Sequence, residues 1–261
     1  MERRGVKATR ETARPRGCRV GASPPVAAEH QQGELMKLLF VVTSHDQLGD
    51  SGVQTGLWYE ELAAPYYVFT DAGHQVTIAS PKGGKPPVDP RSTNPPFDAP
   101  VCHRFDADAT AQAALADTAV LASVAAEDFD AIFYPGGHGP MFDVVEDKSS
   151  IALIEAFYAA GKYVASVCHG PGSLRRTQTP DGQPLVAGRH VTGFTNAEEV
   201  DSKALDDVPF LIEDEFVRLG GIFEKVANWQ PHVVIDGQLI TGQNPGSAQG
   251  VAEALLAQLT Q

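Results

Sequence analysis

The fold is decided by ten residues, Tyr163-Val164-Ala165-Ser166-Val167-Cys168-His169-Gly170-Pro171-Gly172. An apolar run ends abruptly at Cys168, and glycine and proline follow at once, which is the pattern of a buried strand that enters a tight turn before a helix. A side chain at such a corner stands over the carboxyl end of a sheet, and the N–H groups of the next helix face it. Because the helix dipole and the adjacent His169 imidazole both favour negative charge, the pattern predicts an activated cysteine nucleophile. The simpler alternative is a buried cysteine at a strand end, the common fate of a lone cysteine.

Strand and helix signals alternate on both sides of this corner. We expect strands over 37–43, 75–80, 131–137, 163–168, 190–194, 233–235 and 239–242, and helices over 57–72, 107–124, 151–160 and 248–259. Residues 81–100, rich in proline and glycine, indicate a long loop. This alternation predicts an α/β, flavodoxin-like fold: a mostly parallel sheet with helices on both faces and a strand–nucleophile elbow–helix unit.

The first 35 residues differ from the rest in charge and pattern. They carry a net charge of +3, whereas the remaining residues carry −16. They also lack helical or strand periodicity, so residues 1–35 are predicted to be a disordered extension and residues 36–261 a single catalytic domain. An arginine-rich transit peptide is an alternative, although four acidic residues argue against it. A third interpretation takes Met36, which directly precedes the first credible strand, as the biological start.

Composition excludes several classes of function. The net charge of −13 argues against nucleic acid as a partner, because phosphate binding needs a basic face. No apolar run approaches the length that crosses a bilayer, so no membrane span is expected. Three cysteines, Cys18, Cys102 and Cys168, give no disulfide framework and favour a reducing compartment, the cytoplasm.

Three strand-end motifs are expected to meet at one edge of the sheet, because ligand sites of such sheets form at the carboxyl ends of the strands. The motifs are Gly136-Gly137-His138-Gly139, Cys168-His169-Gly170 and Gly193-Phe194-Thr195-Asn196-Ala197-Glu198-Glu199. Glycines 136 and 137 allow backbone N–H groups to approach a ligand, as an oxyanion hole requires. An ordinary glycine turn is the alternative, and His138 either touches substrate or caps that turn.

Further motifs extend along the chain from residue 55 to residue 247. They are Thr55-Gly56, Glu61-Leu62-Ala63-Ala64-Pro65, Val76-Thr77-Ile78-Ala79-Ser80-Pro81-Lys82-Gly83-Gly84, Tyr134-Pro135-Gly136-Gly137-His138-Gly139, Val167-Cys168-His169-Gly170-Pro171, Thr192-Gly193-Phe194-Thr195 and Thr241-Gly242-Gln243-Asn244-Pro245-Gly246-Ser247. In this order they resemble the DJ-1/PfpI superfamily, within the class I glutamine amidotransferase-like fold. The most similar branch is that of the Hsp31-like glutathione-independent glyoxalases, also called glyoxalase III or D-lactate dehydratase.

The resemblance implies roles for four side chains. Cys168 matches the nucleophile, His169 its base, and Glu61 an acid on the first helix whose carboxyl group contacts the thiol. Glu199 matches the acidic partner of the histidine, with the adjacent Glu198 left open. Without the resemblance, Glu61 would be a solvated helix residue, whereas pairing with a thiol in a closed pocket would raise its pKa and keep it protonated.

Two positions depart from the pattern of this branch. Ala64 stands where the branch often has histidine before the proline, which puts the substrate range in doubt. Gly172 stands where alanine is common, a change that the fold should tolerate.

The activity implied by the resemblance is conversion of small 2-oxoaldehydes such as methylglyoxal to 2-hydroxy acids such as D-lactate, through a cysteine hemithioacetal. No cofactor is expected, because the reaction involves no net redox change, and a homodimer is expected. No metal is expected either, because the spacing of His45, Asp46 and His232 fits no recognised metal motif.

Two other classes of function remain open at this stage. A cysteine peptidase or amidase of the PfpI type could use the same thiol and oxyanion hole, and an Hsp31-like stress chaperone could have only weak catalysis. A narrow polar pocket over Cys168 would favour an enzyme that acts on small aldehydes, whereas an extensive apolar surface patch would favour a chaperone. A glutamine amidotransferase proper is disfavoured, because its downstream His-x-Glu pair is not found in the C-terminal third.

Overall fold

The strand that ends at Cys168 lies inside a seven-stranded sheet with the order β10-β11-β7-β6-β1-β4-β5. The structure is a computed structural model and describes residues 1–2 and 34–261. The prediction made for residues 1–35 therefore falls, apart from its ends, outside the described residues. Gly33–Gln261 forms one compact unit.

The strands are β1 (Lys37–Val41), β2 (Gln47–Leu48), β3 (Val53–Gln54), β4 (Gln75–Ser80), β5 (Ala119–Val120), β6 (Ala131–Tyr134), β7 (Tyr163–Val167), β8 (His190–Val191), β9 (Ile222–Phe223), β10 (Val233–Asp236) and β11 (Leu239–Gly242). The α-helices are α1 (Tyr59–Asp71), α2 (Pro100–Ala107), α3 (Ala109–Ala116), α4 (Lys148–Ala159), α5 (Asn196–Asp201), α6 (Ile212–Arg218) and α7 (Ala248–Leu259). The 3₁₀ helices are η1 (Pro90–Thr93), η2 (Leu121–Ser123), η3 (Ala126–Asp128), η4 (Gly139–Met141), η5 (Val144–Glu146), η6 (Gly170–Arg176) and η7 (Pro245–Ser247).

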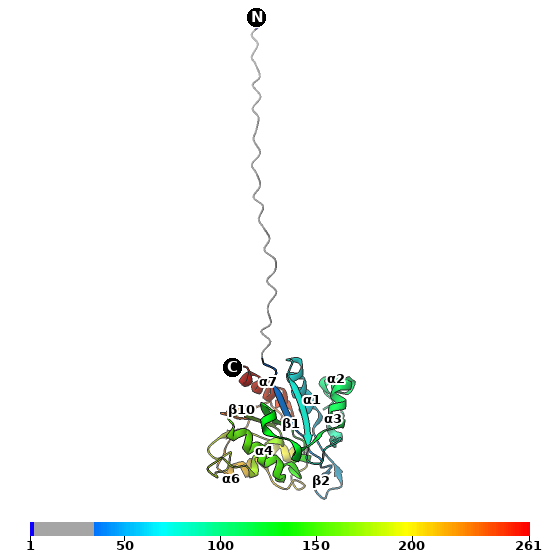
Figure 1. Ribbon diagram of the computed structural model, residues 1–261. Coiled ribbons are helices and arrows are strands. Elements are labelled where there is room, and N and C mark those ends of the chain that lie inside the picture. The colour runs from blue at the N-terminus through cyan, green and yellow to red at the C-terminus, as the bar shows by residue number, and fades with distance from the viewer. Residues whose placement is uncertain (3–33) are drawn as a thin grey trace. The chain divides into compact units, whose positions relative to one another are not determined.

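The main sheet is parallel except at β10, which pairs with β11 in the antiparallel sense. From β1 the chain crosses to β4 on one side, whereas β6 crosses to β7 on the other. Right-handed crossovers in opposite directions place α1 and α4 on opposite faces of the sheet. Helix α7 packs against α1, and the two lie side by side in Figure 1. These features confirm the predicted α/β, flavodoxin-like class.

The central strands are buried on both faces. Every residue of β6 and β11 is buried, and only the first residue of β1 reaches solvent. Two-sided burial explains why these strands are continuous apolar runs without alternating polar residues. Strand β7, buried from its second residue onward, is thereby fixed in the middle of the sheet with its carboxyl end at the ligand-binding edge.

The predicted helix over 107–124 is wrong in its extent. It is interrupted at Asp108, whose extended backbone (φ −90°, ψ 104°) ends α2 and whose carboxylate caps the N–H groups of Thr110 and Ala111 at the start of α3. Thr118 then donates to the carbonyl of Gly84, and Val120 pairs with β4 in the sheet. The alanine-rich composition favoured a helix, but a carboxylate cap and strand pairing divided the segment.

Candidate active site

Cys168 occupies a strained corner directly after β7. Its φ of +60° lies in the left-handed region that residues with a Cβ rarely adopt. Two hydrogen bonds hold it there: its N–H donates to the carbonyl of Gly242 at 2.9 Å, and its carbonyl accepts from Phe194 at 2.8 Å. The next turn needs Gly170, because a Cβ there would lie 2.2 Å from the carbonyl oxygen of Tyr134. The predicted strand and tight turn are present, and the helix that follows is the 3₁₀ helix η6.

Burial opposes the thiolate expected at Cys168. The thiol is buried, with 3% of the residue exposed, and this burial raises its pKa. The N–H of Gly137 acts in the opposite direction and favours negative charge at the sulfur. A thiol in this position has to pass its proton to a neighbouring base when it attacks a substrate.

Glu61 is fully buried beside this thiol. Its Oε2 accepts the N–H of Gly136 at 2.7 Å, while its Oε1 has no hydrogen-bond partner among the described residues. Burial raises the pKa of this carboxyl to about 8, although hydrogen bonding with the Cys168 thiol and the N–H of Gly136 lowers it in part. A carboxyl with this pKa is mostly protonated at neutral pH, the state that the family resemblance implied for Glu61. Because Oε2 already accepts a hydrogen bond, Oε1 is the oxygen available to carry the proton.

Gly136 leaves room for the Glu61 carboxyl group because it has no Cβ. A Cβ at this position would lie 2.7 Å from the backbone nitrogen of His169, 2.8 Å from Glu61 Oε2 and 2.8 Å from the carbonyl oxygen of Val167. Two of these neighbours are backbone atoms of the nucleophile corner and have little freedom to move. The residue that the sequence assigned to an oxyanion hole thus also controls how closely β6 approaches β7.

We expect Gly136→Ala to destabilise the protein by about 1–3 kcal/mol, because overpacking forces the corner to shift. Urea denaturation measures the free energy of unfolding, and turnover should fall along with it. Gly250→Ala in α7 is the matched control, since its new Cβ would meet only the Val233 side chain at 3.2 Å. Equal stability of the Gly136→Ala and wild-type proteins would contradict this account of the corner.

His169 connects the thiol to Glu199. Its Nδ1 lies 3.3 Å from Cys168 Sγ, and its Nε2 lies 2.8 Å from Glu199 Oε2. Glu198, the alternative left open, instead accepts hydrogen bonds from Thr195, from the backbone N–H of Trp229, and from the side-chain amides of Gln243 and Asn244. Glu198 therefore links loops around the site. Glu199, and not Glu198, is the carboxylate in contact with His169.

His138 was considered for oxyanion or substrate contact, and the structure gives it a further neighbour. Its Nε2 lies 2.7 Å from Glu199 Oε1, and its Nδ1 lies 3.1 Å from Arg91 Nη2. Because arginine only donates, Nδ1 must accept, and the proton of the neutral ring lies on Nε2. Burial, assisted by the nearby His169, lowers the pKa of His138 to about 4, so the ring is neutral at neutral pH.

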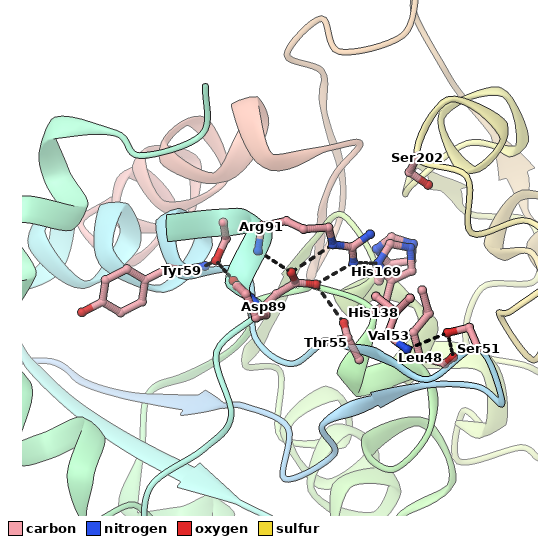
Figure 2. Close-up of polar contacts among 12 residues, drawn as sticks. Leu48, Ser51, Val53, Thr55, Tyr59, Asp89, Arg91, His138, His169 and Ser202 are labelled. Carbon is pink, nitrogen blue, oxygen red and sulfur yellow. Dashed lines mark hydrogen bonds and ion pairs between the residues drawn. The ribbon is translucent and has the colours of Figure 1, made fainter. Parts of the chain in front are cut away.

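The hydrogen-bond chain continues to Asp89, which binds Arg91 through both carboxylate oxygens, at 3.0 and 2.6 Å, and accepts from Thr55 at 2.9 Å. Figure 2 shows Asp89 between Thr55 and Arg91, with the guanidinium extending to the histidines. Sequence reasoning missed Asp89 and Arg91, because both lie in the segment interpreted only as a loop. An Asp-x-Arg pair in a proline-rich loop carried no signal that would have distinguished it from solvated charges.

Glu199 therefore accepts from two imidazoles at once. Burial on its own would raise its pKa, but the two histidines outweigh this effect and hold its pKa well below the usual range. The carboxylate is thus charged throughout the physiological range, and it directs Nε2–H of His169 toward itself. That arrangement leaves Nδ1 of His169 free to accept the proton of the Cys168 thiol.

A pocket of about 260 Å³ opens over the thiol. Its lining is mostly apolar and includes the sulfur, both histidines and Gly137. The remaining lining residues come from five separate parts of the chain: Trp58, Arg91, Phe97, Phe194, Asp201, Ser202, Lys203, Trp229 and Pro245. Of the residues assigned from sequence, Glu61, Gly136, Gly137, His138, Cys168, His169 and Glu199 are thus brought together at one edge of the sheet.

One group of side chains within the described residues has the composition of a metal site. The potential ligand atoms of His138, His169 and Glu199 lie within 4.8 Å of one another. Both Nε2 atoms, however, are already paired with Glu199 by hydrogen bonds of 2.7 and 2.8 Å. His45, considered with Asp46 and His232, instead contacts the carbonyl of Gln47 and stacks on Phe142.

Among the described residues, no helix combines the length and apolar character that crossing a bilayer requires.

Comparison with known proteins places this site in a family. The model of the DJ-1/PfpI family matches residues 53–258. Glyoxalase 3 of Candida albicans is 30% identical over 235 residues, which cover 85% of this chain and 98% of that protein. The glutathione-independent glyoxalase HSP31 of Saccharomyces cerevisiae is 32% identical over 227 residues, with 83% and 94% covered.

Solved structures give the same result. The crystal structure of glyoxalase III from Candida albicans superimposes with a TM-score of 0.78 at 28% identity and covers 85% of this chain and 96% of that one. The Rapid Encystment Protein 24 KDa of Francisella tularensis gives a TM-score of 0.83 at 34% identity, with 87% and 100% covered.

Proposed function

Since the chain belongs to the DJ-1/PfpI family, we propose that it converts 2-oxoaldehydes such as methylglyoxal to 2-hydroxy acids without glutathione. One observation carries the proposal: a single buried thiol has a basic imidazole nitrogen 3.3 Å away and a protonated carboxyl beside it. The isomerisation uses a nucleophile, a base and an acid, and these three groups supply them. The proposal is also supported by relatives named as glyoxalases, which match most of the length of this chain.

The reaction begins with addition of sulfur to the aldehyde carbon. As the Sγ–C bond forms, Nδ1 of His169 takes the thiol proton and returns it to the new alkoxide, which gives a hemithioacetal. The N–H of Gly137, which already favours negative charge at the sulfur, stabilises charge as it develops there. Because Cys168 itself supplies the thiol that adds to the aldehyde, no added thiol such as glutathione is required.

The second stage moves hydrogen between the two oxygen-bearing carbons. His169 removes the C–H proton of the hemithioacetal carbon while Glu61 protonates the ketone oxygen, which gives an enediol. His169 exchanges this proton with solvent and then protonates the second carbon, and Glu61 recovers a proton from the first hydroxyl. The product is a 2-hydroxyacyl thioester of Cys168, which water hydrolyses to the acid and the free thiol. One carbon is oxidised and its neighbour reduced, so the protons and electrons balance without a redox cofactor.

Glu199 and His138 act as positioning residues in this scheme. Glu199 fixes the tautomer of His169, and Arg91 fixes that of His138 so that it donates to Glu199. The burial of Cys168, of which 3% is exposed, favours a small aldehyde over the polypeptide that a peptidase would have to admit.

The proposal is tested by incubating the purified protein with methylglyoxal in buffer free of glutathione and other thiols. We expect the aldehyde to disappear and lactate to appear in equal amounts, with no increase in rate on addition of glutathione. A stereospecific lactate assay identifies the product, for which D-lactate is expected. Consumption of methylglyoxal only after glutathione is added would contradict the proposal.

The pH dependence follows from the raised pKa of Glu61. Because its carboxyl is required in the protonated form, kcat/KM should decrease as pH rises through about 8, where that proton is lost. The profile is measured between pH 6 and 10, values chosen to bracket this pKa by roughly two units on each side, after subtraction of the non-enzymatic reaction. Glu61→Gln should lack this decrease. An activity that instead rises through pH 8 would show that thiolate formation, rather than the Glu61 proton, limits the rate.

A further inference from the structure

The pocket over Cys168 holds an unusual share of the aromatic surface of this protein. Among the described residues, the only exposed phenylalanine, tyrosine or tryptophan side chains are Phe97 and Trp229, at 40% and 41%. Both line this pocket. Two exposed rings at the mouth of one pocket offer an apolar contact surface to a bound ligand.

Two aromatic pairs form the pocket wall. Trp58 and Phe97 lie edge to face with centroids 5.2 Å apart, and Phe194 and Trp229 do so at 5.7 Å. Phe194 also lies against the His169 ring, with centroids 4.3 Å apart, so the apolar wall begins directly at the reacting atoms. Such rings can stack on a flat π-system or pack edge to face against it.

The pocket of about 260 Å³ is larger than the smallest substrate of this chemistry requires. Methylglyoxal, whose only substituent is a methyl group, would leave much of it unfilled.

We propose that the preferred substrates are 2-oxoaldehydes with an aromatic substituent, whose ring packs against these aromatic pairs. The inference rests on the proposed function for the chemistry at Cys168, but its binding part is independent of turnover. Phenylglyoxal is the probe substrate, and mandelate, the 2-hydroxy acid it would give, is the probe ligand.

The two tryptophans make binding measurable without catalysis. Trp58 and Trp229 are the only tryptophans of the chain, and both line the pocket, so intrinsic fluorescence reports on this site. In Cys168→Ala, mandelate should bind at least tenfold more tightly than lactate. In the wild-type protein, kcat/KM for phenylglyoxal should exceed that for methylglyoxal by a similar factor.

Substitutions separate the wall from the chemistry. Phe97→Ala should lower the mandelate-to-lactate and phenylglyoxal-to-methylglyoxal ratios about tenfold. Ile235→Ala, an exposed apolar residue on the edge strand β10, is the control and should leave both ratios unchanged. Equal affinities for mandelate and lactate, or unchanged ratios in Phe97→Ala, would overturn the inference. Selective mandelate binding without turnover of either aldehyde would contradict the proposed function and support the assignment of the pocket.

Discussion

Cys168→Ala should lose methylglyoxal turnover on the order of 10⁴-fold or more, down to the rate of the buffer. Without sulfur no hemithioacetal forms, and the remaining groups have no covalent intermediate on which to act. The measurement is the initial rate of aldehyde consumption in glutathione-free buffer. The variant should stay folded, because alanine removes only one atom from a small buried side chain.

Cys102→Ala is the matched control for this result. Cys102 is likewise buried at 3% exposure, and burial, with the nearby Glu60, raises its pKa to about 11, but it lies in α2 outside the pocket. Its variant should keep the wild-type rate. Residual activity of Cys168→Ala comparable with that of Cys102→Ala would remove Cys168 from the mechanism.

Glu61→Gln is expected to produce the next largest loss, on the order of 10²–10⁴-fold, the usual contribution of a general acid. The amide keeps the size of the side chain and can still accept from the N–H of Gly136, but it has no transferable proton. Turnover of methylglyoxal is compared under the same conditions as wild type, and a melting curve confirms that the variant is folded. Wild-type turnover in this variant would leave the proton transfers to His169 alone.

Glu199→Gln provides the informative comparison with Glu61→Gln. An amide oxygen can accept from one imidazole, so the sequence argument predicted a smaller loss, about ten- to a hundredfold. The structure shifts the expectation toward the upper end, because Glu199 accepts from both His138 and His169. In Glu199→Gln, the side-chain NH₂ group faces one of these two rings. Two N–H donors then point at each other, so that ring loses its hydrogen bond. A loss larger than that of Glu61→Gln would show that Glu199 does more than orient His169.

The sequence predicted the corner at Cys168 and the parallel sheet because both depend on local pattern. A continuous apolar run followed by glycine and proline has few structural solutions, and β7 and the turn after it follow that pattern. The assignments of Glu61 and Glu199 came from the family resemblance. No periodicity distinguishes a buried carboxylate in α1 or α5 from a solvated one, although both side chains are buried.

Two features depended on tertiary structure and were not predicted. The direction of the Cys168 pKa shift is set by how completely the surrounding elements exclude water, which local sequence does not report. The link from Asp89 through Arg91 to His138 depends on the path of a loop that brings residues 47 positions apart into contact. Both are properties of packing rather than of pattern.

The most direct test of the central claim is proton NMR of the product formed from methylglyoxal by the wild-type protein in D₂O without glutathione. The enediol route exchanges protons with solvent through His169, so the account predicts lactate that carries deuterium at its second carbon, and no such product with Cys168→Ala. Lactate that retains the aldehyde hydrogen at that carbon, or lactate formed equally by Cys168→Ala, would contradict the account.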